Sequence, residues 1–257
     1  MNKFILFFSI FLVSCCNKPK LLQNGLTRSA YKITEYAINV ASKDSNNKNL
    51  DTIVITNKRF NKSNKILAQT RHTPSDGQKM ETNYIYNRLG KLEKEIVTMS
   101  IDSLPLEVNY IYNNNLLDQT ISRLDNRNER FEQIEKYYYR SNNTKEKTTT
   151  SLLLIRLNTS DTIINSISTS YFDKKELIKS IETKVYNNQK LNSKTVYEYD
   201  CETLTGLKHF NQNDSLTSTS KYEYKFDRFN NWVEKKIFEN NTVKSIIKRE
   251  IEYNWQY

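Results

Sequence analysis

Short segments in which apolar or aromatic residues alternate with polar ones recur along most of this chain. In residues 108–112, Val-Asn-Tyr-Ile-Tyr, a period of two places Tyr110 and Tyr112 on one face of a strand. A polar turn such as 87–90, Asn-Arg-Leu-Gly, and a second alternating segment such as 92–98 complete the unit. The pattern predicts antiparallel hairpins that keep one face in water.

These hairpins repeat with a nearly constant period. Asn83-Tyr84-Ile85-Tyr86-Asn87 recurs unchanged at positions 109–113, and the last aromatic residue of each copy stands at 60, 86, 112, 139, 172, 199, 226 and 253. The steps are 26, 26, 27, 33, 27, 27 and 27 residues. The long step indicates an insertion, which we place in the polar stretch 142–150. A fixed period of this length is typical of repeat architectures.

A single hairpin cannot bury its aromatic face, so neighbouring copies must pack side by side. Two strands per copy give about 14–16 strands, more than a flat open sheet tolerates. We therefore predict that residues 30–257 form one all-β domain, a long antiparallel meander of repeated hairpins forming a strongly curved sheet or open roll. The tyrosines are expected on its concave face, and charged residues outside or on edges, such as Glu234, Lys235, Lys248 and Glu250.

The first fifteen residues follow a different pattern. Lys3 precedes an almost unbroken apolar run over 4–13, about half of the ~20 residues that a membrane-spanning helix needs. Leu12-Val13-Ser14-Cys15 ends the run, and this stretch resembles the signal peptide of bacterial lipoproteins. The resemblance implies removal of residues 1–14, diacylglyceryl and acyl chains such as palmitate on Cys15, and a flexible tether over 15–29. The alternative is a cleaved secretory signal with a chance cysteine.

The resemblance also implies a location. Residues 16–20, Cys-Asn-Lys-Pro-Lys, contain no acidic residue, and related lipoproteins often use acidic residues here as sorting signals. This implies the outer membrane, with the protein facing the periplasm; the cell surface is the alternative. The lipid bilayer is then a partner through the N-terminal anchor, and a nucleic-acid partner is not expected.

The repeats themselves match a second known pattern. Residues 222–235 read Tyr-Glu-Tyr-Lys-Phe-Asp-Arg-Phe-Asn-Asn-Trp-Val-Glu-Lys, a Tyr-x-Tyr strand ending, a turn and a following hydrophobic strand. Over roughly residues 50–257 the chain resembles the YD repeats of Rhs-type proteins. Asp173, Asp200 and Asp227 keep the aspartate of that family, and Asn61, Asn87 and Asn113 replace it in the first three copies. The resemblance implies a fold and no fixed chemistry.

Composition narrows the picture further. The chain has only 4 glycines and 3 prolines, so its turns must depend on asparagine and aspartate. Aromatic residues make up 12%, which excludes a disordered tract. The net charge of +10 is typical of a lysine-rich solvated sheet face, and it would also attract anionic lipid headgroups or acidic glycans.

Candidate chemistry is sparse. His72 and His209 belong to no metal pattern, and the chain has too few glycines for a phosphate loop. Cys201 is interpreted as an inert thiol, because a bond to Cys16 would reach a residue beside the bilayer. A Cys201–His209 nucleophile pair is the alternative and would make the protein an envelope hydrolase. We predict a non-enzyme with no cofactor and no metal, in which the three repeat aspartates serve turns.

The tyrosine ladder is the candidate ligand face. Its members share one face of their strands: Tyr84, Tyr86, Tyr110, Tyr112, Tyr137, Tyr139, Tyr197, Tyr199, Tyr222 and Tyr224, with Trp232 and Trp255 as additions. Packing into a core is the other interpretation. We predict a lipid-anchored envelope protein acting as a non-enzymatic binding or structural scaffold. The alternative is a module that binds an envelope glycan or a peptide on the concave tyrosine face, since tyrosine offers apolar area and a hydroxyl.

Overall fold

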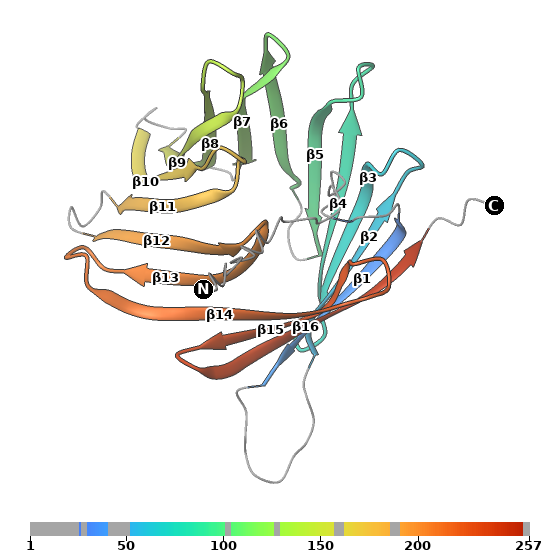
Figure 1. Cartoon of the computed structure of the whole chain (residues 1–257). Helices are drawn as coiled ribbons and strands as arrows, with labels where there is room; N and C mark the ends of the chain where they lie inside the picture. Colours follow the sequence, from blue (N-terminus) through green and yellow to red (C-terminus); the bar gives the residue numbers. More distant parts are fainter. Residues whose placement is uncertain are drawn as a thin grey trace, which may run out of the picture.

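Sixteen antiparallel strands close into one barrel (Figure 1). The computed structural model describes residues 26, 30–40, 52–100, 104–125, 129–156, 162–185 and 191–253. The strands are β1 (Ala30–Asn39), β2 (Thr52–Phe60), β3 (Ile66–Thr73), β4 (Gln78–Tyr86), β5 (Leu92–Met99), β6 (Leu106–Asn113), β7 (Leu116–Asp125), β8 (Glu129–Tyr139), β9 (Lys145–Arg156), β10 (Thr162–Phe172), β11 (Ile178–Val185), β12 (Leu191–Asp200), β13 (Thr203–Phe210), β14 (Leu216–Phe226), β15 (Trp232–Glu239) and β16 (Thr242–Tyr253). Within these ranges, no helix has the length and apolar character needed to cross a membrane.

Strand order follows the chain, and the last strand pairs with the first. β1 and β16 are in antiparallel register from Ala30 opposite Tyr253 to Asn39 opposite Ser245. The all-β, antiparallel part of the sequence prediction is confirmed, but the open roll or curved sheet is wrong. The sheet closes, which pairs the two edges that an open meander would expose.

Closure follows from the way the repeats are distributed. The eight repeat aromatics are the last or next-to-last residues of β2, β4, β6, β8, β10, β12, β14 and β16, and a turn and second strand follow each of the first seven. The eighth copy, in β16, has no strand after it. β1 takes that place from the other end of the chain, so the eighth hairpin is shared between the two termini. We call the end of the barrel where these aromatics lie the repeat rim.

The 33-residue step between the fourth and fifth aromatics does not come from a polar insertion. Residues 142–150 form part of a turn and the start of β9. The additional residues lengthen the strands: β9 and β10 contain 12 and 11 residues, whereas β5 and β6 contain 8 each.

In four of the seven repeat turns, one side chain organises the backbone. Asn61 Oδ1 accepts hydrogen bonds from the backbone N–H groups of Ser63 and Lys65, both at 2.9 Å. Asp227 does the same for the second and fourth residues after it, and so do Asn87 and Asp173. The residue two positions before the next strand has positive φ, as at Asn64, Gly90, Asn143, Glu176 and Asn230. The predicted turn role is therefore confirmed for Asp173 and Asp227; Asp200 ends β12.

The last tyrosine of several copies donates to a backbone carbonyl on the neighbouring strand. The β5–β6 ladder ends at Lys94 opposite Asn109, and Tyr112 Oη donates to the Leu92 carbonyl oxygen beyond it, at 2.9 Å. Tyr86 bonds the Ile66 carbonyl in the same way at 2.8 Å, and Tyr139 the Leu117 carbonyl at 2.8 Å. These hydroxyls join neighbouring hairpins at the repeat rim, where their ladders have ended.

We expect Tyr112→Phe to lower the free energy of unfolding by about 1 kcal/mol, because the Leu92 carbonyl loses its donor. Urea unfolding followed by circular dichroism measures this change. Tyr138→Phe is the matched control, since the Tyr138 side chain is on the outer face and 40% exposed. Equal unfolding midpoints for the two variants would show that the hydroxyl bond contributes nothing.

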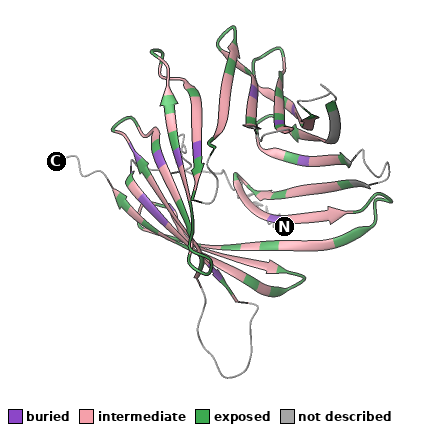
Figure 2. Ribbon diagram, turned by 180° about the vertical axis from the view of Figure 1, so that it is seen from behind, coloured by how far each residue is buried: buried purple, intermediate pink, exposed green. Residues whose placement is uncertain are grey.

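The barrel has few fully buried side chains, and most strand residues have intermediate exposure (Figure 2). One small apolar cluster joins Leu26, Ala30, Ile33 and Phe60, with Ile66 and Ile251 packed against it. Leu26 has no exposed surface, so the chain is held against the barrel at this residue, four positions before β1. The predicted leader, Cys15 and the rest of the predicted tether lie outside the described residues.

Candidate ligand-binding face inside the barrel

Alternate positions of each strand have different surroundings. On β4 and β6, Ile85 and Ile111 are 41% and 39% exposed, whereas the tyrosines beside them are more buried. Tyr110 Oη donates to Glu95 Oε1 on β5 at 2.5 Å, and β5 pairs Glu95 with Tyr84. Tyr84, Glu95 and Tyr110 therefore share the inner face, and the isoleucines face outward.

Every residue of the predicted tyrosine face within the described ranges lies on this inner face, in two groups. The first group contains Tyr84 and Tyr86 on β4, Tyr110 and Tyr112 on β6, and Tyr137 and Tyr139 on β8. The second contains Tyr197 and Tyr199 on β12, Tyr222 and Tyr224 on β14, and Trp232 on β15. Tyr224 and Trp232 are in edge-to-face contact, with ring centroids 6.1 Å apart. Trp255 lies outside the described residues.

Burial keeps the inner tyrosines protonated well above neutral pH. It raises the pKa of Tyr84 to about 12, with the charges of Glu95 and Tyr86 adding to the effect. It raises the pKa of Tyr224 to about 12 as well. Burial, together with the Glu95 hydrogen bond, raises the pKa of Tyr110 further. The inner hydroxyls are therefore neutral donors and acceptors at physiological pH.

A charged cluster that the sequence did not predict lies beside the second tyrosine group. The Glu35 carboxylate on β1 accepts hydrogen bonds from Arg249 Nε, at 2.6 Å to Oε1, and from Lys58 Nζ, at 3.1 Å to Oε2. The Arg249 guanidinium stacks on Trp232, 3.3 Å from the ring centroid. Lys235 Nζ is 4.4 Å from the centroid of the Tyr222 ring. We call Glu35, Lys58, Lys235 and Arg249, with Trp232, the inner charged cluster.

Lys235 corrects one sequence prediction. The sequence predicts it outside with Glu234, Lys248 and Glu250. In the structure it lies opposite Tyr224 on β14 and Ile247 on β16, and residues in register share a face, so Lys235 is inside. The signal was present, because alternation along β15 puts Lys235 and Ile237 on one face and Glu234 on the other. Glu234 and Lys225 form an outer pair at 2.8 Å, as predicted for Glu234.

A cavity of about 330 Å³ opens on the inner face near the repeat rim. Its lining combines cations, aromatic rings and apolar side chains: Ile33, Lys58, Phe60, Asn64, Lys65, Ile66, Gln69, Tyr86, Leu92 and Arg249. Lys65 Nζ donates to the Gly90 carbonyl oxygen at 2.5 Å and lies 5.2 Å from the centre of the Tyr86 ring. Apolar walls with a few convergent polar groups are typical of small-ligand sites.

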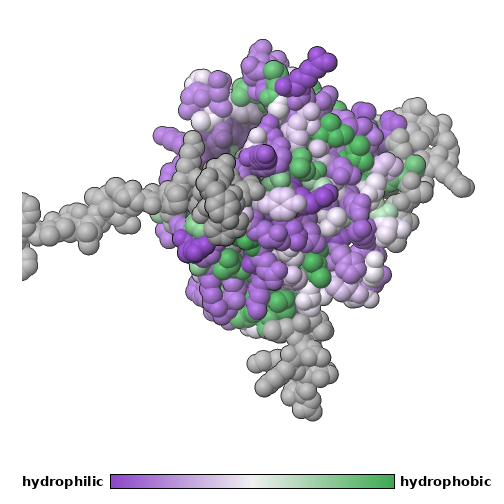
Figure 3. Space-filling view, turned by 90° about the vertical axis from the view of Figure 1, so that its right-hand side faces the viewer, coloured by the Kyte–Doolittle hydropathy of each residue, from purple (hydrophilic) through white to green (hydrophobic). Residues whose placement is uncertain are grey.

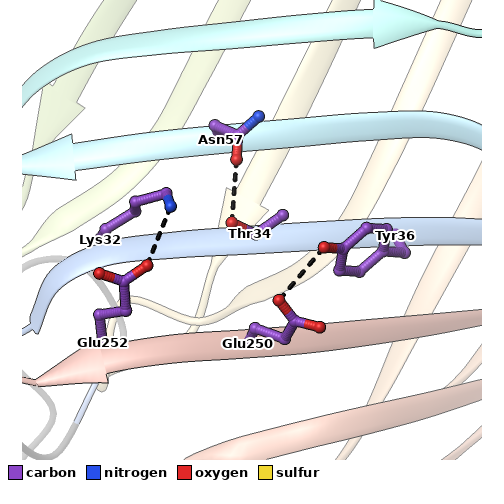
Figure 4. Close-up of polar contacts among 6 residues, drawn as sticks. All are labelled: Lys32, Thr34, Tyr36, Asn57, Glu250 and Glu252. Atoms are coloured by element: carbon purple, nitrogen blue, oxygen red, sulfur yellow. Dashed lines mark hydrogen bonds and ion pairs between the residues drawn. The ribbon is translucent and has the colours of Figure 1, made fainter.

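The outer face carries ion pairs on most strands of the barrel. Figure 4 shows the outer side of β1, where Lys32 contacts Glu252 at 2.9 Å and Tyr36 donates to Glu250 at 3.1 Å. Further outer pairs join Lys94 to Glu107, Arg123 to Glu132, Lys194 to Glu182, Lys208 to Glu198 and Lys225 to Glu234. In Figure 3, hydrophilic side chains spread over the visible face, with hydrophobic ones in small groups between them.

The candidate nucleophile pair does not form. Cys201 lies in the β12–β13 turn and is disulfide-bonded, so it is not the free thiol that the sequence suggested. His209 Nδ1 is 3.1 Å from Thr195 Oγ1 and is ~20 Å along β13 from that turn. His72 is exposed on β3. In the described part of the chain, no group of three or more His, Cys, Asp or Glu side chains could hold a metal ion.

We expect Cys201 to resist alkylation in denatured, unreduced protein and to react fully after reduction, because a disulfide holds no nucleophilic thiolate. Peptide mass spectrometry after iodoacetamide treatment measures both states. Carbamidomethyl-Cys201 as the main species without reductant would contradict the prediction.

Two solved structures are similar to this chain in fold. One is a porin-like protein from Bacteroides uniformis, with a TM-score of 0.54 and 11% identity over 87% of this chain and 98% of that one. Another is a porin-like protein from Bacteroides vulgatus, with a TM-score of 0.55 and 12% identity over 89% of this chain and 100% of that one. At this identity the likeness extends to the fold alone. No family model and no curated protein matches the chain.

Proposed function

We propose that this chain is a non-enzymatic envelope lipoprotein whose barrel stands in water and binds an envelope glycan on its inner tyrosine face. The observation that carries the proposal is the division between the two faces. Aromatic rings and hydroxyls line the inside, and ion pairs lie on the outside of most strands. A barrel with this division offers its binding surface to the lumen and its charges to the solvent.

The outer face is suited to water. A membrane-spanning barrel presents an apolar outer band ~25 Å tall, and a lysine or arginine at its midplane costs about 2–4 kcal/mol. Here Lys94, Lys208 and their partners Glu107 and Glu198 lie within the strands on that side. Apolar outer residues such as Ile85 are interspersed with these charges. We therefore place the barrel beside the bilayer, with the Cys15 lipid as its attachment.

The entry of the chain supports an orientation. Ala30 begins β1 opposite Tyr253 at the repeat rim, and Leu26 is buried in the small apolar cluster that contains Ala30. Residues 16–25 would reach about 17 Å as a flexible coil. This short tether turns the repeat rim toward the membrane. We assign the outer membrane, with the barrel on its periplasmic side; the cell surface is the alternative.

The inner face is suited to a sugar chain. A barrel of sixteen strands is wide enough to leave an aqueous interior. Its tyrosines combine flat apolar rings with hydroxyls that stay protonated at neutral pH, so they can stack on sugar rings and bond their hydroxyls. Peptides share part of this chemistry and belong among the tested ligands.

Two experiments test this function. Radiolabelled palmitate should enter the wild-type protein and not Cys15→Ala, and label that persists in the variant would defeat the anchor. The detergent-solubilised mature protein should bind a set of oligosaccharides on an array of envelope glycans and peptides. Tyr222→Ala should weaken that binding at least ten-fold, while the outward Tyr138→Ala leaves it unchanged. Selective binding of peptides, or equal loss in both variants, would overturn the glycan assignment.

A further inference from the structure

The inner charged cluster contains more positive than negative charge. Glu35 is its single carboxylate, and both oxygens are engaged, Oε1 by Arg249 and Oε2 by Lys58. Among the described residues, no ion pair joins Lys235 to a carboxylate. Lys65, in the adjacent cavity, bonds a carbonyl oxygen. Three cations of the cluster therefore share one anion.

These charges are substantially withdrawn from water. The side chains of Arg249, Glu35 and Lys58 are 14%, 17% and 25% exposed. Burial lowers the pKa of Lys235, and the neighbouring Arg249 charge lowers it further. A cation held away from water without a counter-charge is unfavourable, and a bound anion would relieve that cost. The cluster has the properties of a site that a negatively charged group completes.

We propose that Lys235 and Arg249 bind the carboxylate of an acidic sugar, so that the glycan accepted by the barrel is an acidic one. This inference rests on the proposed function and specifies its ligand. The aromatic rings beside the two cations favour a sugar acid over a free ion. Trp232 lies under the Arg249 guanidinium. The ring centroids of Tyr222 and Tyr224 lie 4.4 and 6.0 Å from Lys235 Nζ. A sugar ring stacked on this wall would present its carboxylate to both cations.

The neighbouring cavity supplies room for such a residue. Arg249 and Lys58 line both the cavity and the cluster, and the cavity volume of about 330 Å³ is at the lower end of the range for ligand sites. Phe60 and Tyr86 provide further apolar and aromatic wall. The acidic residue would lie between Arg249 and Lys235, and the rest of the chain would continue along the tyrosines.

Matched ligands separate this inference from the proposed function. The full mature protein carrying Trp255→Phe retains Trp232 as its single tryptophan, and its fluorescence reports on the Arg249 contact. We would titrate carboxylate-bearing oligosaccharides selected on the array, the same oligosaccharides after carboxyl reduction to the neutral sugar, and inorganic phosphate. The acidic forms are expected to bind at least ten-fold more tightly than the reduced forms and to change Trp232 emission.

Lys235→Met tests the assigned residue, and Lys236→Met, one position along and on the outer face, is its control. Lys235→Met should lower the affinity for the acidic oligosaccharide to about the affinity for its neutral, carboxyl-reduced form. Lys236→Met should leave the affinity for the acidic oligosaccharide unchanged. Equal affinities for acidic and reduced forms would overturn the anion site while glycan binding stands. Binding of no oligosaccharide would overturn both, and phosphate binding as tight as the acidic sugar would overturn the assignment to a sugar acid.

Discussion

Glu35→Gln is expected to lower the free energy of unfolding by about 3 kcal/mol, because two partly buried cations lose their shared counter-charge. Arg249 and Lys58 both contact this carboxylate, at 2.6 and 3.1 Å, and neither has another carboxylate partner among the described residues. Urea unfolding at pH 7 measures the change. Glu252→Gln, which breaks the outer pair with Lys32, should cost less than 1 kcal/mol.

The same carboxylate gives the barrel a defined acid sensitivity. Burial raises the pKa of Glu35, but the charges and hydrogen bonds of Arg249 and Lys58 outweigh burial and hold the pKa below its ordinary value of 4.5. A depressed folded-state pKa contributes stability above 4.5 that is lost as the pH falls through the folded value. Wild type should therefore lose more stability than Glu35→Gln below pH 4.5. Parallel curves for the two proteins would contradict the ion-pair account.

Alkaline solution is expected to unfold the barrel cooperatively between pH 10 and pH 12. Tyr84 and Tyr224 have pKa values of about 12 against an ordinary 10, so the folded state holds protons that the unfolded state releases. This contribution to stability is complete below pH 10 and is lost as the pH rises through 12. Tyr110 and Tyr137, whose pKa values burial also raises, add to the effect.

Absorbance at 295 nm and far-ultraviolet circular dichroism, recorded on the same samples, measure this transition. The buried tyrosines should ionise together with the loss of β structure. Tyr84→Phe combined with Tyr224→Phe should move the midpoint to higher pH, because two ionisations no longer favour unfolding. Gradual ionisation of all 17 tyrosines near pH 10 with the sheet intact would show that burial does not raise the pKa of the inner tyrosines.

Much of the local structure could be predicted from the sequence. The spacing of the aromatics placed the hairpins, and a period of two placed Tyr84 and Tyr110 on one face. The scarcity of glycine predicted turns made by asparagine and aspartate, as seen at Asn61 and Asp227. These features depend on residues close together in the chain, so a short stretch of sequence contains all the information needed.

The inner charged cluster could not be found in this way. Glu35 and Arg249 are 214 positions apart, and their contact exists only because β1 pairs with β16. Lys235 was visible by alternation, but its neighbours on β1 and β16 were not. A cluster made by strands from both ends of the chain has no local pattern in the sequence.

The sequence by itself determined a repeated hairpin, its turns and its aromatic face, since backbone geometry and side-chain alternation are local properties. The tertiary structure decided whether the sheet ends or closes. Closure depends on the accumulated twist and curvature of sixteen strands and on the distant β1 completing the eighth hairpin. It also decided which charges lie inside, because a closed sheet has an interior and an open one does not.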